Sequence, residues 1–141
     1  MAEAALKGLI SADASTLYEQ GIRASFAFEG ASDVDEYIAA HPLPADKAGA
    51  LQEICMQRWL AGFLTDSIEA WSDWRRTNIP AMKLSEFQKN NNGHTVLPYR
   101  LTFEATDKDR NEDMYNDAVS KYLGGKDDRW TRLWWDVADN E

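Results

Sequence analysis

Residues 51–80 read LQEICMQRWLAGFLTDSIEAWSDWRRTNIP, and the spacing of their apolar side chains decides the fold class. From Leu51 to Phe63 the apolar residues recur at steps of three and four, which is typical of one face of an α-helix. Asp46 lies where a helix N-cap is expected. The pattern therefore predicts a long helix that begins at Asp46 and runs to about residue 64. Its predicted apolar face consists of Leu51, Ile54, Cys55, Trp59 and Phe63.

The remainder of this stretch predicts a second helix after a break. Gly62 and the polar residues 65–67 both weaken a helix, so we expect a break or kink there. Beyond the break, Trp71 and Trp74 are three residues apart and fall on one helical face. Pro80 then stops the helix, because the residue before a proline avoids helical backbone angles. We interpret this end of the stretch as a helix end whose tryptophans face the core.

The chain before residue 51 also favours helices. Residues 2–10 contain strong helix formers but begin without a capping residue, so we interpret them as the later turns of a helix. Thr16 opens a capping box, and Gly30 supplies a stop for the helix that follows. Residues 32–35 can cap a further short helix, which residues 41–44 end.

The second half of the chain differs in character. Residues 90–93 are Asn-Asn-Asn-Gly, which is turn chemistry. Residues 95–103 alternate loosely and predict a short extended segment, although Pro98 argues against a central strand. One further helix is expected from Asn111 to the glycine pair at 124–125. Its predicted inward face consists of Met114, Tyr115, Ala118, Val119 and Tyr122.

These patterns together predict a mainly α-helical protein arranged as an irregular helical array. We place residues 1–141 in a single region, with residues 1–80 helical and residues 81–141 rich in loops around one further helix. Helix pairs in the first half are also compatible with a helical-repeat solenoid.

Composition and charge exclude several classes of function. The chain has 141 residues and a net charge of −9, with Arg75-Arg76 as its only adjacent basic pair. Nucleic-acid binding depends on clustered Lys and Arg, so we expect no nucleic-acid partner. The single cysteine, Cys55, excludes a disulfide framework and is expected to be a small core residue. The first residues show neither a signal peptide nor a lipobox.

Neither catalysis nor metal binding has a clear signature. His41 and His94 lie in different predicted loops, and neither neighbours a Ser or Cys in a nucleophile motif. A small hydrolase therefore stays only as a weak alternative, and we expect no cofactor. Oxygen-bearing residues at alternate positions resemble the start of a calcium loop. The sharp-turn Gly and the bidentate Glu of that loop are absent, so a solvated loop is the alternative. The calcium candidates are Asp107, Asp109, Asn111 and Asp113.

Tryptophan is the most informative residue type. A flat indole offers a rigid surface to the apolar C–H face of a sugar ring, although aromatic residues also fill cores. The helical periodicity of Trp59, Trp71 and Trp74 favours the core for these three residues. Packing is favoured for the other three as well, but their local structure is not predicted, so they are our candidate ligand-binding residues. These candidates are Trp130, Trp134 and Trp135.

Residues 51–80 also carry a family resemblance. A helix with Gln-Arg-Trp that leads to Glu-Ala-Trp-x-Asp-Trp-Arg-Arg-Thr and a proline resembles a segment of the SusD/RagB outer-membrane lipoproteins. The segments AEAALKG, LYEQGIRASF, LPYRLTFEATDKDRNEDMYNDAV and RLWWD resemble other family segments in the same order. The residues that match the family pattern, which we interpret as structural, are Trp59, Glu69, Trp71, Asp73, Trp74, Arg75, Arg76 and Arg100.

The resemblance implies a fold and a function. It implies the C-terminal part of an α-superhelical fold that contains tetratricopeptide-like helix pairs. Family members bind nutrients at the outer membrane and cell surface, mainly oligosaccharides and in some branches peptides. They do not catalyse, and they deliver the ligand to a SusC-like TonB-dependent transporter. A different class stays open: a helical-repeat module that binds proteins or peptides. If the chain is only a C-terminal part, Leu6, Leu9 and Ile10 should be poorly covered.

Overall fold

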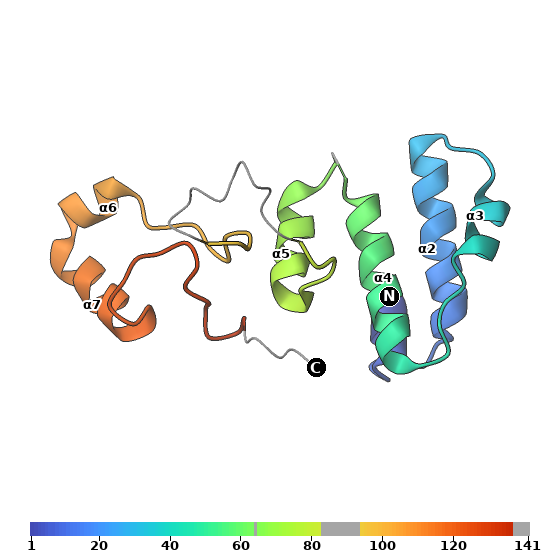
Figure 1. Ribbon diagram of the computed structural model, residues 1–141, viewed down its shortest axis with the longest axis horizontal. Coiled ribbons are helices and arrows are strands. Elements are labelled where there is room, and N and C mark those ends of the chain that lie inside the picture. The colour runs from blue at the N-terminus through green and yellow to red at the C-terminus, as the bar shows by residue number, and fades with distance from the viewer. Residues whose placement is uncertain (64, 83–93, 137–141) are drawn as a thin grey trace. The chain divides into compact units, whose positions relative to one another are not determined.

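The computed structural model describes residues 1–63, 65–82 and 94–136, and it is helical, as predicted (Figure 1). The helices are α1 (Ala2–Leu6), α2 (Ala14–Glu29), α3 (Val34–Ala40), α4 (Lys47–Ala61), α5 (Ser67–Thr77), α6 (Ala105–Arg110) and α7 (Glu112–Tyr122). The described ranges contain no strand. The chain divides into two compact units, unit 1 (Met1–Trp74) and unit 2 (Arg75–Glu141). No helix among the described residues is long and apolar enough to cross a membrane.

Helix α2 begins three residues earlier than the predicted capping box. Asp13 is its N-cap, and one carboxylate oxygen accepts from the Thr16 amide at 2.7 Å and from the Thr16 hydroxyl at 2.6 Å. The prediction that Thr16 caps this helix is wrong, because the carboxylate of Asp13 already occupies the capping role. These two hydrogen bonds lower the pKa of Asp13. Gly30 ends α2 at a φ of 66°, as predicted, since a left-handed residue there favours glycine.

The core of unit 1 lies between the first four helices. Its buried residues are Ala2, Tyr18, Ile22 and Ile54, and partly buried apolar residues of α1, α2 and α3 pack against them. Helices α2 and α4 lie side by side, with α3 against α2 (Figure 1). The side chains that complete this packing are Leu6, Leu17, Phe26, Val34, Tyr37, Ile38 and Leu43.

A line of polar side chains crosses this core. The Tyr18 hydroxyl donates to the carbonyl oxygen of His41 at 2.9 Å and to Glu53 at 3.2 Å. Gln57 donates to the same Glu53 oxygen at 3.0 Å and accepts from the Tyr37 hydroxyl at 3.0 Å. Helices α2, α3 and α4 are therefore joined by hydrogen bonds as well as by apolar contact.

Helix α4 confirms most of the predicted pattern. Asp46 caps it by accepting from the Gly49 amide at 2.7 Å, and Ile54 and Cys55 are buried. The break after the helix also occurs where it was predicted. The placement of Phe63 on the core face is wrong, because α4 ends at Ala61 and leaves that side chain 64% exposed.

Two short elements differ from their predictions. Helix α1 ends at Leu6 rather than near residue 10, and Gly8 adopts a φ of 73° directly after it. Leu9 is 75% exposed, as expected for a poorly covered residue, whereas Leu6 packs against the core. The extended segment predicted over residues 95–103 is not a strand in the described residues, although Tyr99 and Arg100 each donate an amide hydrogen bond to the carbonyl oxygen of Arg129.

Unit 2 contains α6, which was not predicted, and α7, which was. Helix α7 ends near Gly124 and Gly125, both at positive φ, and its Val119 is buried. The predicted inward face is too wide, because Met114 is 63% exposed and Tyr122 is 66% exposed. Val119 is the only residue of α7 that is buried. The predicted turn at residues 90–93 lies outside the described residues.

Candidate functional site

The C-terminal tryptophan pair occupies a tight turn. The Asp136 amide donates to the carbonyl oxygen of Leu133 at 2.9 Å, which closes a four-residue turn. Trp134 and Trp135 are its two central residues. Trp134 is 87% exposed and Trp135 is 36% exposed, so the indole of Trp134 lies almost wholly in solvent. We call residues 133–136 the tryptophan turn.

A buried carboxylate closes this turn. Asp136 is 1% exposed, and one of its carboxylate oxygens accepts from Arg132 Nη1 at 2.6 Å. The other oxygen has no hydrogen-bond partner among the residues that the structure describes. Burial raises the pKa of Asp136, while the charges of Arg132 and Arg75 act in the opposite direction. The turn therefore rests on a charged group that has been removed from water.

Two arginines connect the tryptophan turn to other parts of unit 2. The guanidinium carbon of Arg75 lies 4.9 Å from the ring centroid of Trp135, and Arg75 Nη1 donates to the carbonyl oxygen of Tyr99 at 3.0 Å. The guanidinium carbon of Arg132 lies 4.0 Å from the ring centroid of Tyr99. Cation–π contacts of this kind stabilise partly buried arginines. Burial lowers the pKa of Arg75.

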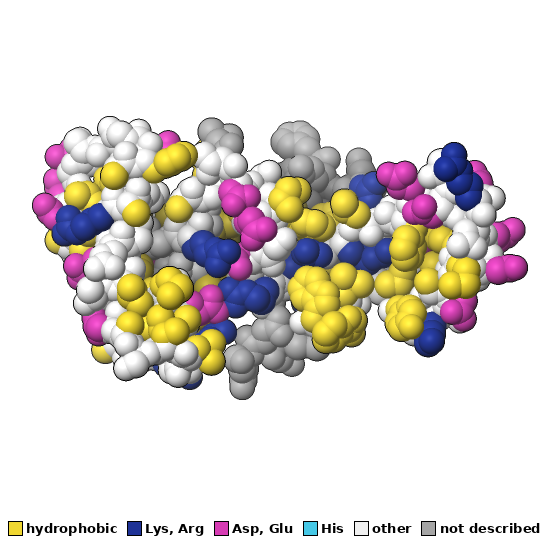
Figure 2. Space-filling view, turned by 180° about the vertical axis from the view of Figure 1, so that it is seen from behind, with side chains coloured by type: hydrophobic (Ala, Val, Ile, Leu, Met, Phe, Trp, Pro, Cys, Tyr) yellow, Lys and Arg dark blue, Asp and Glu magenta, His cyan; other side chains and the backbone are white. Residues whose placement is uncertain are grey.

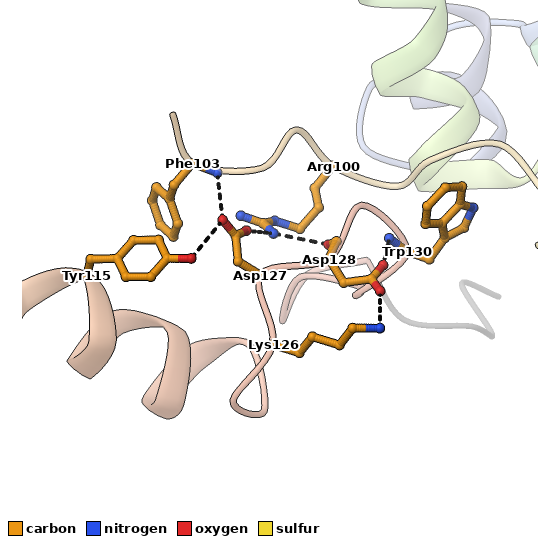
Figure 3. A network of polar contacts seen from close by, with 7 residues as sticks. All are labelled: Arg100, Phe103, Tyr115, Lys126, Asp127, Asp128 and Trp130. Atoms are coloured by element: carbon orange, nitrogen blue, oxygen red, sulfur yellow. Dashed lines mark hydrogen bonds and ion pairs between the residues drawn. The ribbon is translucent and has the colours of Figure 1, made fainter. Parts of the chain in front are cut away.

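Arg100 holds a second network, which Figure 3 shows from close by. This side chain is buried and pairs with the Asp127 carboxylate, and its Nη1 also donates to the carbonyl oxygen of Asp128 at 3.1 Å. The second carboxylate oxygen of Asp127 accepts from the Phe103 amide at 3.1 Å and from the Tyr115 hydroxyl at 3.3 Å. Through Asp127, Arg100 is thus connected to Tyr115 of α7, while its role in the protein stays a prediction.

Trp130 packs rather than projecting into solvent. Its ring stacks on His94, with centroids 3.9 Å apart and planes 6° from parallel. Its indole nitrogen donates to the carbonyl oxygen of Val96 at 2.9 Å, and its amide donates to Asp128 at 2.6 Å. Hydrogen bonds from Lys126 and from this amide lower the pKa of Asp128. Of the three candidate tryptophans, the structure therefore brings together Trp134 and Trp135 and gives Trp130 a local packing role.

The family-pattern residues of α4 and α5 form a polar contact in unit 1. Arg58 Nε lies 2.6 Å from Asp73, and Arg58 Nη2 lies 3.9 Å from Glu69. Trp74 is 3% exposed, whereas Trp59 is only half-buried. A cavity of about 270 Å³ lies between the two helices, and its lining includes Arg58, Trp59, Glu69 and Asp73. Trp71 and Arg76 are half-buried as well.

The calcium candidates are spread over two short helices and the residue between them. Asp107 and Asp109 belong to α6, where alternate residues point to different sides of the helix. Asn111 separates α6 from α7, and Asp113 lies in the first turn of α7. Among the described residues, no three His, Cys, Asp or Glu side chains converge where they could hold an ion. His41 packs against Tyr37, with ring centroids 4.4 Å apart.

Unit 1 also carries a groove between α1, α2 and α4. Its volume is about 480 Å³, and apolar side chains line most of it. Tyr18, Gln57 and Arg58 add hydrogen-bonding groups. Hydrophobic side chains reach the surface in several separate groups on the face drawn in Figure 2. The apolar lining includes Leu17, Ile22, Phe26, Ile54 and Leu60.

Sequence reasoning named Trp134 and Trp135 as candidates, without predicting their exposure, and did not name Arg132 or Asp136. Arg132 and Asp136 are four residues apart in RLWWD, a spacing that also suits an ion pair on a helix surface. The spacing was therefore a usable signal for the pair itself. No local pattern indicated that Arg75, more than fifty residues earlier, contacts Trp135.

Comparison with known proteins identifies the family. A SusD-like family model, described as starch-binding and associating with the outer membrane, matches residues 1–104. A chitin-binding SusD homolog from Flavobacterium johnsoniae is similar at 34% identity and a TM-score of 0.82, over 98% of this chain and 34% of that chain. A SusD homolog from Bacteroides fragilis is similar at 30% identity and a TM-score of 0.83, over 96% of this chain and 33% of that one. A search of the curated proteins gave no match.

The chain therefore belongs to the SusD-like family, as its sequence indicated, and it has that family's helical fold. It spans about a third of the length of the solved relatives that it matches. A further relative, a chitin-binding protein, is similar at 33% identity and a TM-score of 0.81, over 96% of this chain and 31% of that chain.

Proposed function

We propose that residues 1–141 act as one SusD-like region that binds an oligosaccharide at the bacterial cell surface without changing it chemically. The full protein would then hand the ligand to a SusC-like TonB-dependent transporter. Support comes from the family description, which links starch binding to the outer membrane, and from the two similar proteins that bind chitin. The ligand class is therefore a neutral glycan, and the protein's role is capture rather than catalysis.

The single observation that carries a glycan site on this chain is the exposure of Trp134. Trp134 carries a large apolar ring at the corner of the tryptophan turn, and this residue is 87% exposed to water. Covering about 60 Å² of this ring with a sugar face at about 25 cal/mol per Å² would contribute ~1.5 kcal/mol. Trp135, beside it in the turn, would supply the edge of the same surface. The net affinity would be modest, because binding also orders the sugar chain.

Calorimetric titration with chitohexaose and maltohexaose tests this proposal. We expect at least one of them to bind the protein and expect Trp134→Ala to weaken that binding about tenfold, since ~1.4 kcal/mol corresponds to a factor of ten in Kd. Phe28→Ala is the matched control, because Phe28 is an aromatic residue of unit 1 that is 78% exposed. Equal loss in both variants, or no loss in Trp134→Ala, would remove Trp134 from the site.

The groove of unit 1 favours a second candidate function, which is the binding of a polypeptide. An amphipathic helix with apolar residues at three- and four-residue steps suits a groove that is apolar along most of its lining. A volume of about 480 Å³ accommodates several such side chains. Leu60→Glu would place a charge in this lining, so it should reduce capture of a helical peptide and leave titration with chitohexaose unchanged. Unchanged capture of the peptide by Leu60→Glu would remove the polypeptide function and leave the glycan function alone.

A further inference from the structure

We propose that Asp136, Arg132 and Arg75 form a positioning unit that holds Trp134 and Trp135 in their ligand-ready arrangement before any ligand arrives. This inference rests on the proposed function, in which the tryptophan turn contacts a sugar ring. None of the three charged side chains needs to touch the ligand. Their role is to fix a turn that would otherwise sample many conformations.

The first step of the argument is that Asp136 secures the turn twice. Its amide closes the turn through the hydrogen bond to Leu133, 2.9 Å long, and its carboxylate accepts from Arg132 at 2.6 Å. The backbone of Asp136 therefore closes residues 133–136, and its side chain joins the end of the turn to Arg132, the residue directly before it. A turn held only by its backbone hydrogen bond would keep more conformational freedom.

The second step is that both arginines are themselves anchored. Arg132 lies over the Tyr99 ring at 4.0 Å, and Arg75 donates to the carbonyl oxygen of Tyr99 at 3.0 Å. Arg75 also lies 4.9 Å from the centre of the Trp135 ring. Tyr99 is thus a common support, and the tryptophan turn is connected through two cations to a segment more than thirty residues earlier in the sequence.

The third step concerns the unfavourable free energy of burying the Asp136 charge. Asp136 is 1% exposed, and one carboxylate oxygen lacks a hydrogen-bond partner among the described residues. Burying a charge with an unmet oxygen is unfavourable, and an apolar residue of similar size would bury area without this penalty. A carboxylate, however, attracts two guanidinium groups at once, which an apolar residue or a neutral amide cannot do. A role in positioning the tryptophan turn therefore explains why a charged residue stands at position 136.

The fourth step is the gain in binding. Immobilising a side chain on association is unfavourable, so a platform fixed in advance avoids part of that loss of entropy. Trp135, which is only 36% exposed and lies against Arg75, is held in this way. Trp134 depends on the turn alone, because it is 87% exposed. Loss of the Asp136 charge should therefore affect Trp134 through the backbone of the turn.

The test compares Asp136→Asn with the wild type in two measurements. In the first, chitohexaose and maltohexaose are titrated by calorimetry, and we expect the variant to bind about tenfold more weakly. In the second, the protein is labelled with 5-fluorotryptophan, and the ¹⁹F NMR lines are assigned by single Trp→Phe substitutions. We expect the lines of Trp134 and Trp135 to shift or broaden, while the line of buried Trp74 in unit 1 stays unchanged.

Asp128→Asn is the matched control. Asp128 is a half-buried carboxylate of the same unit, but it binds Lys126 and the Trp130 amide rather than the tryptophan turn. This variant should leave the Trp134 line and the affinity unchanged. Arg132→Lys is the second test variant, because lysine keeps the positive charge but lacks the planar guanidinium group with its fixed donor geometry. It should change the same two NMR lines as Asp136→Asn.

Two outcomes would overturn the inference. One is an unchanged pair of Trp134 and Trp135 lines in both Asp136→Asn and Arg132→Lys. The other is an equal change in Asp128→Asn, which would indicate general loosening of unit 2. If neither oligosaccharide binds the wild type, the proposed glycan function fails, and the NMR lines alone decide whether Asp136 positions the turn.

Discussion

At the residue scale, Tyr18 illustrates how a polar group is accommodated in the core of unit 1. Its side chain is 4% exposed, yet its hydroxyl donates to the carbonyl oxygen of His41 and to Glu53. Burial raises the pKa of this hydroxyl, and the nearby Glu53 charge raises it further. Tyr18 therefore stays protonated in the folded protein, where it donates hydrogen bonds to both partners.

Replacing this hydroxyl should lower stability. Tyr18→Phe leaves the carbonyl oxygen of His41 without this donor, whereas Glu53 still accepts from Gln57, and one unsatisfied buried group costs roughly 1–3 kcal/mol. Chemical denaturation with urea measures the change in the free energy of unfolding. Tyr122→Phe is the control, since Tyr122 is 66% exposed and should change stability by less than about 0.5 kcal/mol. Equal stability of both variants would contradict the hydrogen-bonded role of Tyr18.

The same residue predicts an effect at alkaline pH. The folded pKa of Tyr18 is raised above its ordinary value of 10.0, so the unfolded chain loses this proton at a lower pH than the folded protein does. Stability from this group is present below pH 10 and is lost as the pH rises above that value. Thermal unfolding between about pH 9 and 11 should therefore show a steeper fall in Tm for the wild type than for Tyr18→Phe. Parallel curves would exclude Tyr18 as a source of the pH dependence.

At the element scale, the first turn of α4 depends on a close fit around a glycine. Asp46 accepts from the Gly49 amide, and a Cβ added at Gly49 would lie 2.8 Å from an Asp46 carboxylate oxygen and 3.0 Å from the Cβ of Pro44. The Asp46 cap therefore requires a residue without a Cβ at position 49. In the middle of α2, by contrast, a Cβ added at Gly21 would meet nothing within 4 Å.

This contrast predicts opposite effects for two identical substitutions. Gly49→Ala should destabilise the protein by about 1 kcal/mol, because the displaced cap costs more than the better helix propensity of alanine gains. Gly21→Ala should stabilise it by roughly 0.5–1 kcal/mol through propensity alone. Differential scanning calorimetry of the two variants gives the comparison directly. Stabilisation by both would mean that the Asp46 cap can shift without cost.

Sequence patterns predicted the long elements better than the short ones. The helix after Asp46 and the helix with Trp74 follow from apolar periodicity, which sums over many residues. Helix α6 has six residues and was missed, because so short a segment carries too few apolar positions to show a period. The start of α2 was misplaced because Asp13 and Thr16 are both good capping residues, and only their geometry decides between them.

The candidate site was predictable only in part for a related reason. Exposure of Trp134 depends on a turn whose closing hydrogen bond joins residues 133 and 136. Two adjacent tryptophans in a sequence are equally compatible with packing, so the sequence left both interpretations open. The contact between Arg75 and Trp135 joins positions far apart in the chain, and contacts of that kind are set by tertiary packing rather than by local pattern.

At the scale of the whole molecule, many large apolar side chains are exposed. Leu9 and Phe28 are 75% and 78% exposed, and Leu101 of unit 2 is 75% exposed. Such side chains favour association, whereas a net charge of −9 opposes it by repulsion between molecules. The balance between these two effects depends on ionic strength, since salt screens the repulsion but not the apolar contact.

We therefore expect the protein to self-associate more strongly as salt is added. Sedimentation velocity across a range of protein concentrations measures this association. The double variant Leu9→Glu with Phe28→Glu should weaken it, because both substitutions place charges on exposed apolar positions. Gln52→Glu adds a negative charge at an exposed polar position and should have a smaller effect. A monomer at every salt concentration would show that these side chains are compatible with free solution.

The burial of Cys55 allows the opening of unit 1 to be measured by thiol modification. This residue is the only thiol among 141 residues, and it is 5% exposed on α4. A thiol-reactive dye therefore modifies the folded protein only when unit 1 opens around α4, and the modification rate reports how often that happens. Unit 2 contributes no thiol to the signal, so the modification rate reports on unit 1 alone.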